Sequence, residues 1–310
     1  MEKIAIYSAF YYIEDFGFNY MQTHDFVRKV NEKSGNINFC SIEKLTQSLG
    51  NLNTRLVDRQ SLTLEAAAKL AEDKGMFDDI DRHNLSVIAG SYSSAIYPSA
   101  EFNLSIEEKG ANFVNPTSFT NTVGNAVVSR LCIWNQFRGK VYALSEGVHS
   151  GLNAIIDAYY NIKYKNSTQI LACATEEIGS SIVFINSYEK EKSEQQPICY
   201  IKNCYSRYLG HVSAKECICS LEKAFDADLK AVDIYLSGDF DIANDILNQL
   251  EKDDIEVQPL INKNMFSITP IIDLGRCLSN YKNKLTKDSL IICGDAGGFV
   301  SAIQLTGGAN

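Results

Sequence analysis

The strongest candidate for chemistry in the chain is a strand–turn–helix segment at residues 143–151, with the sequence ALSEGVHSG. Small residues around a tight turn that opens directly into a helix form an elbow. The side chain at its apex is held at the helix N-terminus, where partial positive charge lowers the pKa of a thiol and favours anions. A catalytic elbow needs a nucleophile there, but Val148 occupies the apex and has no reactive group. The run 147–151 also departs from the hydrolase pattern G-x-S-x-G, because His149 replaces the serine.

Three polar residues of the elbow, Glu146, His149 and Ser150, are the remaining candidates for a base and a nucleophile. Adjacent residues of a helix point in different directions, which argues against a joint role. We therefore expect His149 to be a packed or hydrogen-bonded histidine rather than a catalyst. The alternative, in which these residues act on a bound substrate, stays open at this point.

Two other segments could be taken for binding motifs. Residues 294–298, GDAGG, could be a phosphate loop, but the residues that follow are strand-like. Since a phosphate cradle needs a helix N-terminus there, we predict a tight hairpin. Lys263 lies in a locally apolar stretch, and a lone lysine of this kind is usually a surface residue. Cys217 and Cys219 are too close for zinc spacing and the four histidines are isolated, so we predict no metal and no bound cofactor.

Composition narrows the class of protein. The chain has 310 residues, of which 45% are hydrophobic and 22% charged, and its net charge is −9. An acidic chain gains nothing from a phosphate backbone, so we expect no nucleic-acid partner. We find no apolar stretch of about 18 residues and no signal-peptide pattern at Met1, which predicts a protein without membrane spans. Nine scattered cysteines are typical of reduced, mostly buried thiols in a cytoplasmic protein.

The elements that position these residues alternate between strands and helices. Helical periodicity covers residues 58–75, 150–164, 242–250 and 270–281, and in the first of these Glu65 and Lys69 are predicted to form an exposed pair. Apolar runs predict strands at residues 3–8, 85–90, 141–145, 169–174, 181–186, 231–236, 289–293 and 299–305. The pattern predicts an α/β protein with mixed sheets between helices, in two halves, 1–190 and 191–310, that form one compact unit.

Several segments match one family in order along the chain. Residues 115–126, NPTSFTNTVGNA, follow the pattern N-P-x-x-F-x-N-T-x-x-N-A. Residues 137–145, FRGKVYALS, are similar to a strand of the form L-x-G-P-x-x-T-x-S, and Gly297 and Gly298 fit the end of a G-F-G-G turn. The helix after residues 55–59 and the glycine-ended strand at 88–93 complete the set. Together they resemble the β-ketoacyl-[acyl carrier protein] synthase family.

The resemblance implies a thiolase-like, five-layered αβαβα fold of two similar halves. It also implies that the active set of the family is largely missing. Val148 occupies the position of the nucleophilic cysteine and Ile268 that of the second histidine, while the first histidine has no counterpart and Lys263 is retained. Ala296 replaces the gating phenylalanine. The long capping segment that the family inserts after Glu177 is absent, which implies a shortened capping region.

A chain of this kind resembles the degenerate subunit of heterodimeric synthases, the chain-length factor. The resemblance implies a non-catalytic partner that pairs with an active ketosynthase and shapes the acyl tunnel in type II fatty-acid, polyketide or polyene biosynthesis. Acyl carrier protein, with its phosphopantetheine-bound substrate, would then bind to the partner subunit rather than directly to this chain. Residues implied at the inter-subunit pocket are Phe119, Thr120, Val123, Asn125, Ala296, Gly297 and Gly298.

Alternatives remain open. Phe119, Thr120 and Val123 could instead pack under the elbow helix. The chain could be a repurposed enzyme that transfers, hydrolyses or decarboxylates acyl thioesters through Glu146, His149 or Ser150. It could also be a structural scaffold whose acyl pocket has collapsed, with large side chains filling the elbow. Whether the chain is an enzyme at all is uncertain from its sequence, because without the cysteine and the two histidines the condensation step has no residue to carry it.

Overall fold

The computed structural model describes residues 3–13, 16–19, 28, 32, 42–50, 57–188, 196–210, 213–238, 240–261, 265–283 and 287–307. Lys263, the one retained residue of the implied catalytic set, lies outside these ranges. The predicted boundary at 190/191 also lies outside them, within residues 189–195. It falls between two strands, and the proposed division into halves remains a prediction.

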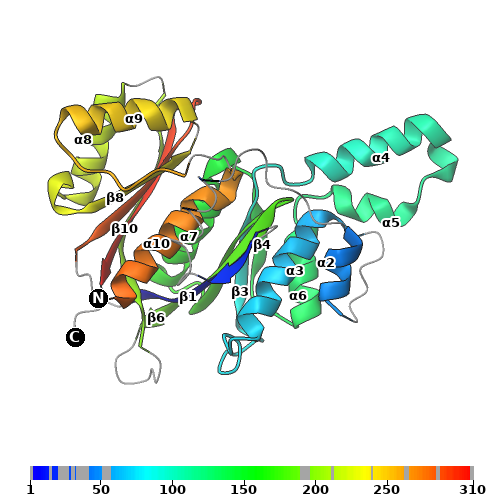
Figure 1. The fold of residues 1–310 in the computed structure, drawn as a ribbon. Helices are drawn as coiled ribbons and strands as arrows, with labels where there is room; N and C mark the ends of the chain where they lie inside the picture. Colours follow the sequence, from blue (N-terminus) through cyan, green and yellow to red (C-terminus); the bar gives the residue numbers. More distant parts are fainter. Residues whose placement is uncertain are drawn as a thin grey trace.

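The described strands form one mixed sheet (Figure 1). They are β1 (Lys3–Ile13), β2 (Phe16–Asn19), β3 (Ser86–Gly90), β4 (Val141–Leu144), β5 (Gln169–Glu176), β6 (Gly179–Tyr188), β7 (Cys199–Tyr208), β8 (Asp233–Gly238), β9 (Ser289–Gly294) and β10 (Phe299–Gly307). Their order is β4-β3-β5-β6-β1-β7-β10-β9-β8, with β2 paired to β1. Three residue pairs between residues 4–6 of β1 and 199–201 of β7 join the two half-sheets.

The two half-sheets repeat one topology. From the junction outward, β1-β6-β5-β3 corresponds to β7-β10-β9-β8. In each half the inner pairs are antiparallel and the last pair is parallel, β3 with β5 and β8 with β9. β4 extends the first half in parallel beside β3, and a parallel bridge from Ile234 to Val257 begins the same extension beside β8. The chain therefore consists of two copies of one α/β topology.

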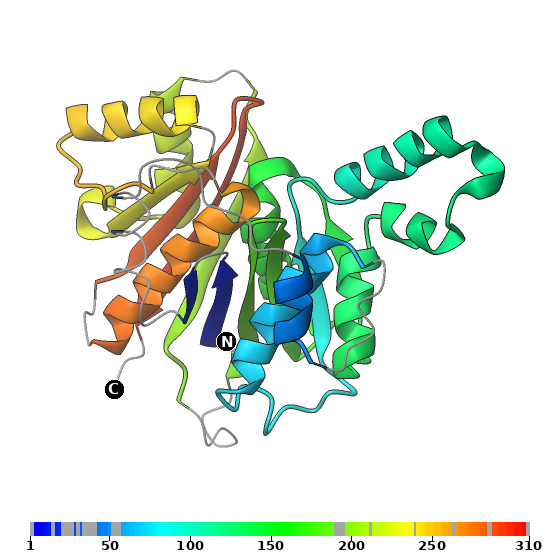
Figure 2. The same ribbon diagram turned by 45° about the vertical axis from the view of Figure 1, so that its right-hand side comes forward.

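Helices and half-sheets alternate in five layers. Short 3₁₀ turns are η2 (Ala111–Phe113), η3 (Thr120–Thr122), η4 (Gly147–His149), η5 (Leu229–Ala231) and η6 (Phe266–Ile268). The α-helices are α2 (Ile42–Ser48), α3 (Arg59–Glu72), α4 (Ile96–Lys109), α5 (Pro116–Phe119), α6 (Ala126–Asn135), α7 (Ser150–Lys163), α8 (Ala214–Phe225), α9 (Phe240–Lys252) and α10 (Thr269–Lys282). α7 and α10 lie together between the half-sheets, while α2, α3 and α6 cover the outer face of the first and α8 and α9 that of the second (Figures 1 and 2). This is the predicted thiolase-like αβαβα fold.

Local sequence explains where α3 and α10 begin. Asp58 caps α3 by accepting a hydrogen bond from the backbone N–H of Ser61, and Pro270 lies in the first turn of α10, where its missing N–H costs nothing. The prediction for Glu65 is wrong. Its side chain is buried between α3 and α6 and accepts a hydrogen bond of 2.7 Å from Nδ2 of Asn135. Nearly the whole first half of α3 is covered by neighbouring elements, so its outward face has little contact with water.

Two features of the first half shape its surface near the elbow: a short β5–β6 turn and a projecting helical arm. β5 and β6 are joined by a turn of two residues, Glu177 and Ile178, which confirms that the family's capping segment is absent there. Residues 96–125, which include α4, η2, α5 and η3, project from the body as a helical arm (Figures 1 and 2). Across the described residues, no helix has the length and apolar character to span a bilayer.

Candidate functional site

The elbow has the predicted form. After β4 the chain turns through η4 and enters α7 directly. Two glycines allow neighbouring backbone segments to pack in direct contact at the elbow. A Cβ at Gly90, the last residue of β3, would lie 2.0 Å from the carbonyl oxygen of Ser150, and one at Gly151 would lie 2.1 Å from that of Ser267 in η6. Any side chain at either position would force these segments apart.

The apex of the elbow is apolar and closed. Val148 is 6% exposed and Ile268 is fully buried, and both belong to the central hydrophobic core with Leu152 of α7. η4 and η6 pack against each other, so the fold brings the apex and the following turn together although they are far apart in sequence. Neither side chain can accept a proton, attack a carbonyl or donate to an oxyanion.

Ser150 is held by the backbone. It is fully buried, its Oγ lies 2.8 Å from the carbonyl oxygen of Gly147 and 3.1 Å from that of Ser91, and it accepts a 2.8 Å hydrogen bond from the N–H of Glu146. The Glu146 carboxylate accepts from the amide of Asn153 and does not contact Ser150. The hydroxyl therefore closes the elbow turn, which is a structural role.

His149 is buried beneath the turn that connects β9 and β10. It is 1% exposed, and its Nε2 lies 3.4 Å from Oδ2 of Asp295, within ion-pair distance but without hydrogen-bond alignment. Burial lowers the pKa of His149, and the nearby carboxylate of Asp295 opposes that shift. Of the two expected states, packed or hydrogen-bonded, the structure shows the packed one, and neither ring nitrogen has a hydrogen-bond partner among the described residues.

A buried polar cluster under the elbow was not predicted. Glu176, at the end of β5, is 2% exposed and accepts hydrogen bonds from the N–H of Tyr92 at 2.6 Å, from Oγ of Ser93 at 3.1 Å and from Oγ of Ser267. Gln60 of α3 donates to Ser93. Burial raises the pKa of Glu176. The only sequence signal is an acidic residue directly after an apolar strand, and the cluster ties β3, β5 and η6 together.

The arm is the opposite of the elbow, because apolar side chains lie on its surface. None of residues 96–125 is buried, and six large apolar side chains are exposed. These are Ile96 at 61%, Tyr97 at 50%, Leu104 at 55%, Phe113 at 78%, Phe119 at 56% and Val123 at 45%. Large apolar side chains gathered in one exposed segment are typical of interaction sites, so the arm is a candidate interaction surface.

The structure excludes one of the two placements considered for the arm residues. Phe119 and Val123 are exposed, so they do not pack under the elbow helix. The hydroxyl of Thr120 donates to the carbonyl of Thr117, and Asn125 is exposed at the start of α6. Their place in an inter-subunit wall remains a prediction. Beyond the arm, Ile133 of α6 is 74% exposed and Val141 of the edge strand β4 is 37% exposed.

One arginine fastens the arm to the body. The guanidinium of Arg130 in α6 pairs with the carboxylate of Asp58, the N-cap of α3, and lies 3.1 Å from Oγ of Ser61. It also donates to Oδ1 of Asn121 and, at 3.3 Å, to the hydroxyl of Thr120 at the end of the arm. Because these groups come from three elements, Arg130 sets the angle of the arm.

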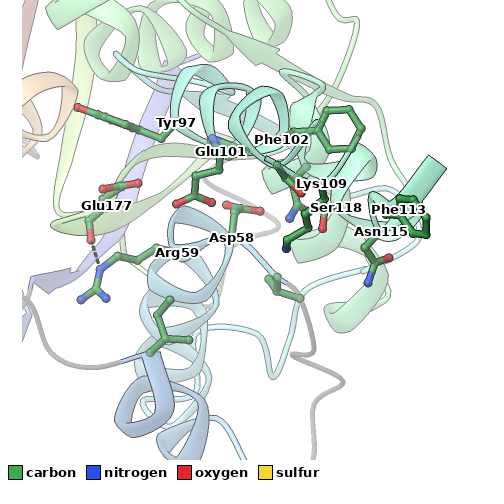
Figure 3. Close-up of a pocket in the computed structure, with 15 residues that line it drawn as sticks. Asp58, Arg59, Tyr97, Glu101, Phe102, Lys109, Phe113, Asn115, Ser118 and Glu177 are labelled. Carbon is green, nitrogen blue, oxygen red and sulfur yellow. Dashed lines mark hydrogen bonds between the residues drawn. The ribbon is translucent and has the colours of Figure 1, made fainter. Parts of the chain in front are cut away.

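A cavity of about 560 Å³ lies between the arm and the body (Figure 3). Carboxylates from three elements line it: Asp58 of α3, Glu101 of α4 and Glu177 of the β5–β6 turn. Burial raises the pKa of Glu177, the Arg59 guanidinium opposes the shift, and the other two carboxylates reinforce it. Nε of Arg59 donates a hydrogen bond of 3.0 Å to the carbonyl of Glu177. The cavity is bounded by the short turn that replaces the capping segment.

The glycine-rich turn is a hairpin, as predicted. β9 and β10 pair in antiparallel register across it, from Gly294 with Val300 onward. Gly298 has φ +89°, and a Cβ there would lie 2.1 Å from the carbonyl oxygen of Gly210, so glycine is required. Ala296 and Gly297 are exposed at its tip, and no bulky side chain gates the elbow from this position.

The comparisons with known proteins agree with this geometry. A model of the β-ketoacyl synthase N-terminal domain matches residues 19–197, more than half of the chain. The chain belongs to the β-ketoacyl synthase family. A search among curated protein sequences finds no match.

Three solved structures have the same fold as this β-ketoacyl synthase family chain. The ishigamide ketosynthase/chain length factor has a TM-score of 0.81 at 14% identity, with 99% of this chain and 100% of that one covered. AntDE–AntF, a type II polyketide synthase acyl-carrier protein in complex with its ketosynthase, has a TM-score of 0.77 at 14% identity, covering 99% and 100%. A β-ketoacyl synthase from Burkholderia phymatum STM815 has a TM-score of 0.77 at 12% identity, covering both chains fully. At these identities the likeness establishes the fold alone.

Proposed function

We propose that this chain is a non-catalytic subunit of a type II β-ketoacyl synthase, of the chain-length-factor kind. It pairs in the cytoplasm with a catalytic ketosynthase and forms part of the wall of the acyl tunnel. Its pathway makes a fatty acid, polyketide or polyene by the acyl-transfer chemistry of its partner. The observation that carries the proposal is the buried pair of Val148 and Ile268 at the apex of the elbow.

That pair removes the chemistry of the condensation step. The step needs a nucleophile that holds the acyl chain and donors that stabilise the developing oxyanion. The elbow provides the backbone shape without either group. The hydroxyl of Ser150 is hydrogen-bonded to backbone carbonyls, and the side chain of His149 is buried. A fold that keeps this shape and loses its reactive groups suits a subunit that contributes surface rather than turnover.

The arm supports the pairing. Residues 96–125 have no buried member, although a folded helical segment ordinarily needs an apolar face covered by other residues. Outside the arm, Ile133 of α6 and Val141 of the edge strand β4 also expose apolar side chains. An edge strand with free hydrogen-bonding groups and an adjacent apolar surface suits a partner of the same fold. Two of the similar solved structures carry a ketosynthase with a chain length factor or a carrier protein in their descriptions.

Charge indicates where the acyl carrier protein binds. Carrier proteins are acidic, and this chain has a net charge of −9, so the two surfaces repel at long range. We therefore assign carrier docking to the partner. The phosphopantetheine-bound substrate reaches the shared tunnel from that side, and this chain needs no cofactor of its own.

The test is co-expression with a type II ketosynthase that retains the cysteine and both histidines. We expect a stable one-to-one complex, and intact-mass analysis after incubation with an acyl-carrier thioester should find the acyl group on the partner alone. Replacing Phe119 by Ala should alter the length of the product chain, because Phe119 is assigned to the tunnel wall. Tyr164→Ala, an equally exposed aromatic change at the end of α7, should leave product length unchanged.

Two results would contradict the proposal. One is an acyl adduct on this chain, or thioester turnover by this chain alone that His149→Ala abolishes, which would restore the enzyme alternative. The other is a stable homodimer that no active ketosynthase subunit enters.

A further inference from the structure

A buried histidine under the β9–β10 turn has no role in the proposed function. Within the described residues, His149 is 1% exposed and neither of its ring nitrogens has a hydrogen-bond partner. Buried polar groups nearly always form hydrogen bonds, so a buried group without one lowers the stability of the closed structure. The turn that covers it has an exposed tip at Ala296 and Gly297.

The turn is held closed mainly by contacts within itself and with the end of β7. Its own hydrogen bonds run from the N–H of Phe299 to Oδ1 of Asp295 at 2.9 Å, from the N–H of Gly298 to the carbonyl of Asp295 at 3.1 Å and from the N–H of Asp295 to the carbonyl of Phe299 at 3.1 Å. One bond ties it to the end of β7, from the N–H of Leu209 to the carbonyl of Gly298 at 2.8 Å. The ring of Phe299 also lies 5.1 Å from that of Tyr208 in β7, between centroids. Over His149 lies the ring of Phe299, 6.3 Å away between centroids.

Charged groups reach His149 from two directions. Asp295 lies on the turn at 3.4 Å, and Glu146 precedes η4 and also acts on the imidazole. On the β9 side, Sγ of Cys293 lies 3.7 Å from the carbonyl oxygen of Val148. η6, which packs against η4 from the α10 side, contributes no titratable side chain.

We propose that the β9–β10 turn, residues 294–298, is a proton-operated latch that closes over neutral His149 and opens when His149 is protonated. The closed site suits a neutral imidazole, because it provides no hydrogen-bond acceptor in line and excludes water. Burying a cation there costs more free energy than the attraction of the misaligned carboxylate of Asp295 and the more weakly acting one of Glu146 recovers. In the open state water hydrates the imidazolium. Opening exposes the β9 end of the elbow, next to Val148.

The direction of the effect follows from linkage. Burial lowers the pKa of His149 in the closed state, and the open state restores the ordinary value near 6.5. The open state therefore binds more protons, so the closed state loses stability as the pH falls below that value. This inference does not depend on the proposed pairing, since it concerns one chain.

Cysteines of the chain itself can report opening. Cys293 precedes the turn and is fully buried, Cys219 is exposed on α8, and Cys277 is fully buried in α10. The full-length protein is labelled with 4,4′-dithiodipyridine at about pH 7.5 and about pH 5.5, and peptide mass spectrometry gives the rate at each cysteine. Dividing the Cys293 rate by the Cys219 rate removes most of the pH dependence of the thiol reaction. Cys277 reports global unfolding.

We expect the Cys293-to-Cys219 ratio to rise about threefold to tenfold on acidification, because each unit between the two pKa values allows up to about tenfold. His149→Gln and His149→Phe should abolish the rise, and either variant suffices if the other fails to fold. His83→Gln, at an exposed histidine, should retain it. Asp295→Asn should enlarge it, because the attraction that favours the closed cation is removed.

Three results would overturn the inference. They are a ratio that does not change with pH, a rise that persists in both His149 variants, and labelling of Cys277 in step with Cys293. The last result would mean that acid unfolds the whole molecule rather than the turn.

Discussion

The elbow and the arm of this molecule differ in where their apolar side chains lie. The elbow buries apolar residues at a position where the family has reactive ones, and the arm exposes apolar residues on its surface. At the elbow, where members of the family carry reactive side chains, Val148 and Ile268 are apolar and buried. On the arm, where a monomer would place polar groups, Phe113 and Leu104 are apolar and exposed. The elbow apex therefore offers no reactive group, and the arm offers an apolar surface. This difference supports the proposed role, in which the chain contributes contact surface rather than turnover.

The largest expected effect concerns the arm. The double change Leu104→Glu and Phe113→Glu places two charges on the exposed apolar side chains of the arm. We expect association with the partner subunit to weaken about 100-fold or more. Analytical ultracentrifugation measures the association, with Tyr164→Glu, an exposed aromatic residue at the end of α7, as the control. Unchanged association in the double variant would remove the arm from the interface.

The joint between the two regions comes next. Arg130→Met leaves the carboxylate of Asp58 largely buried without its cation and releases Thr120 from the arm. We expect a loss of about 2–4 kcal/mol in the free energy of unfolding. Urea denaturation measures it. Arg82→Met breaks an exposed pair with Glu72 and should cost less than about 1 kcal/mol. Equal losses in the two variants would mean that Arg130 does not fasten the arm.

A smaller effect tests the helix that supports both regions. Burial raises the pKa of Glu65 from 4.5 to about 7. The unfolded chain releases this proton first, so the contribution of Glu65 to stability is highest below pH 4.5 and falls as the pH rises to about 7. Glu65→Gln keeps the contact with Asn135 and should stabilise the protein by about 1–3 kcal/mol above pH 7, with little effect near pH 4. Thermal unfolding across this range, with exposed Glu72→Gln as the control, checks both the sign and the window.

The smallest effect returns to the elbow. Val148→Cys restores the missing thiol with little change in volume, so stability should change by less than about 1 kcal/mol. We expect no acyl-enzyme on incubation with acyl thioesters, because Ile268 provides no donor and the site is closed. Intact-mass analysis measures it. Formation of an acyl-enzyme would mean that the elbow has lost only its nucleophile.

Local pattern was enough to predict much of the fold. The apolar faces of α7 and α10 and the alternation of strands and helices predicted the layers. A helix that buries one face repeats its apolar residues with the period of the helix, and this repeat can be recognised in the sequence. Glu65 was misplaced for the same reason. Its spacing from Lys69 is typical of an exposed pair, and nothing local signals that α6 covers that side of α3. Glu176 was missed because its donors come from two segments far from it in the sequence, residues 92–93 and Ser267.

The sequence alone gives the identities of Val148 and Ile268, and with the family resemblance they predict that the condensation chemistry is missing. The tertiary structure decided what replaced it. Packing of η4 against η6 closes the apex, and the β9–β10 turn covers His149 without an aligned hydrogen bond to it. Arg130 holds an arm whose large apolar side chains stay exposed among the described residues. The reason is physical: a missing reactive group is a property of one residue, whereas burial and exposure belong to contacts between segments that only the folded chain brings together.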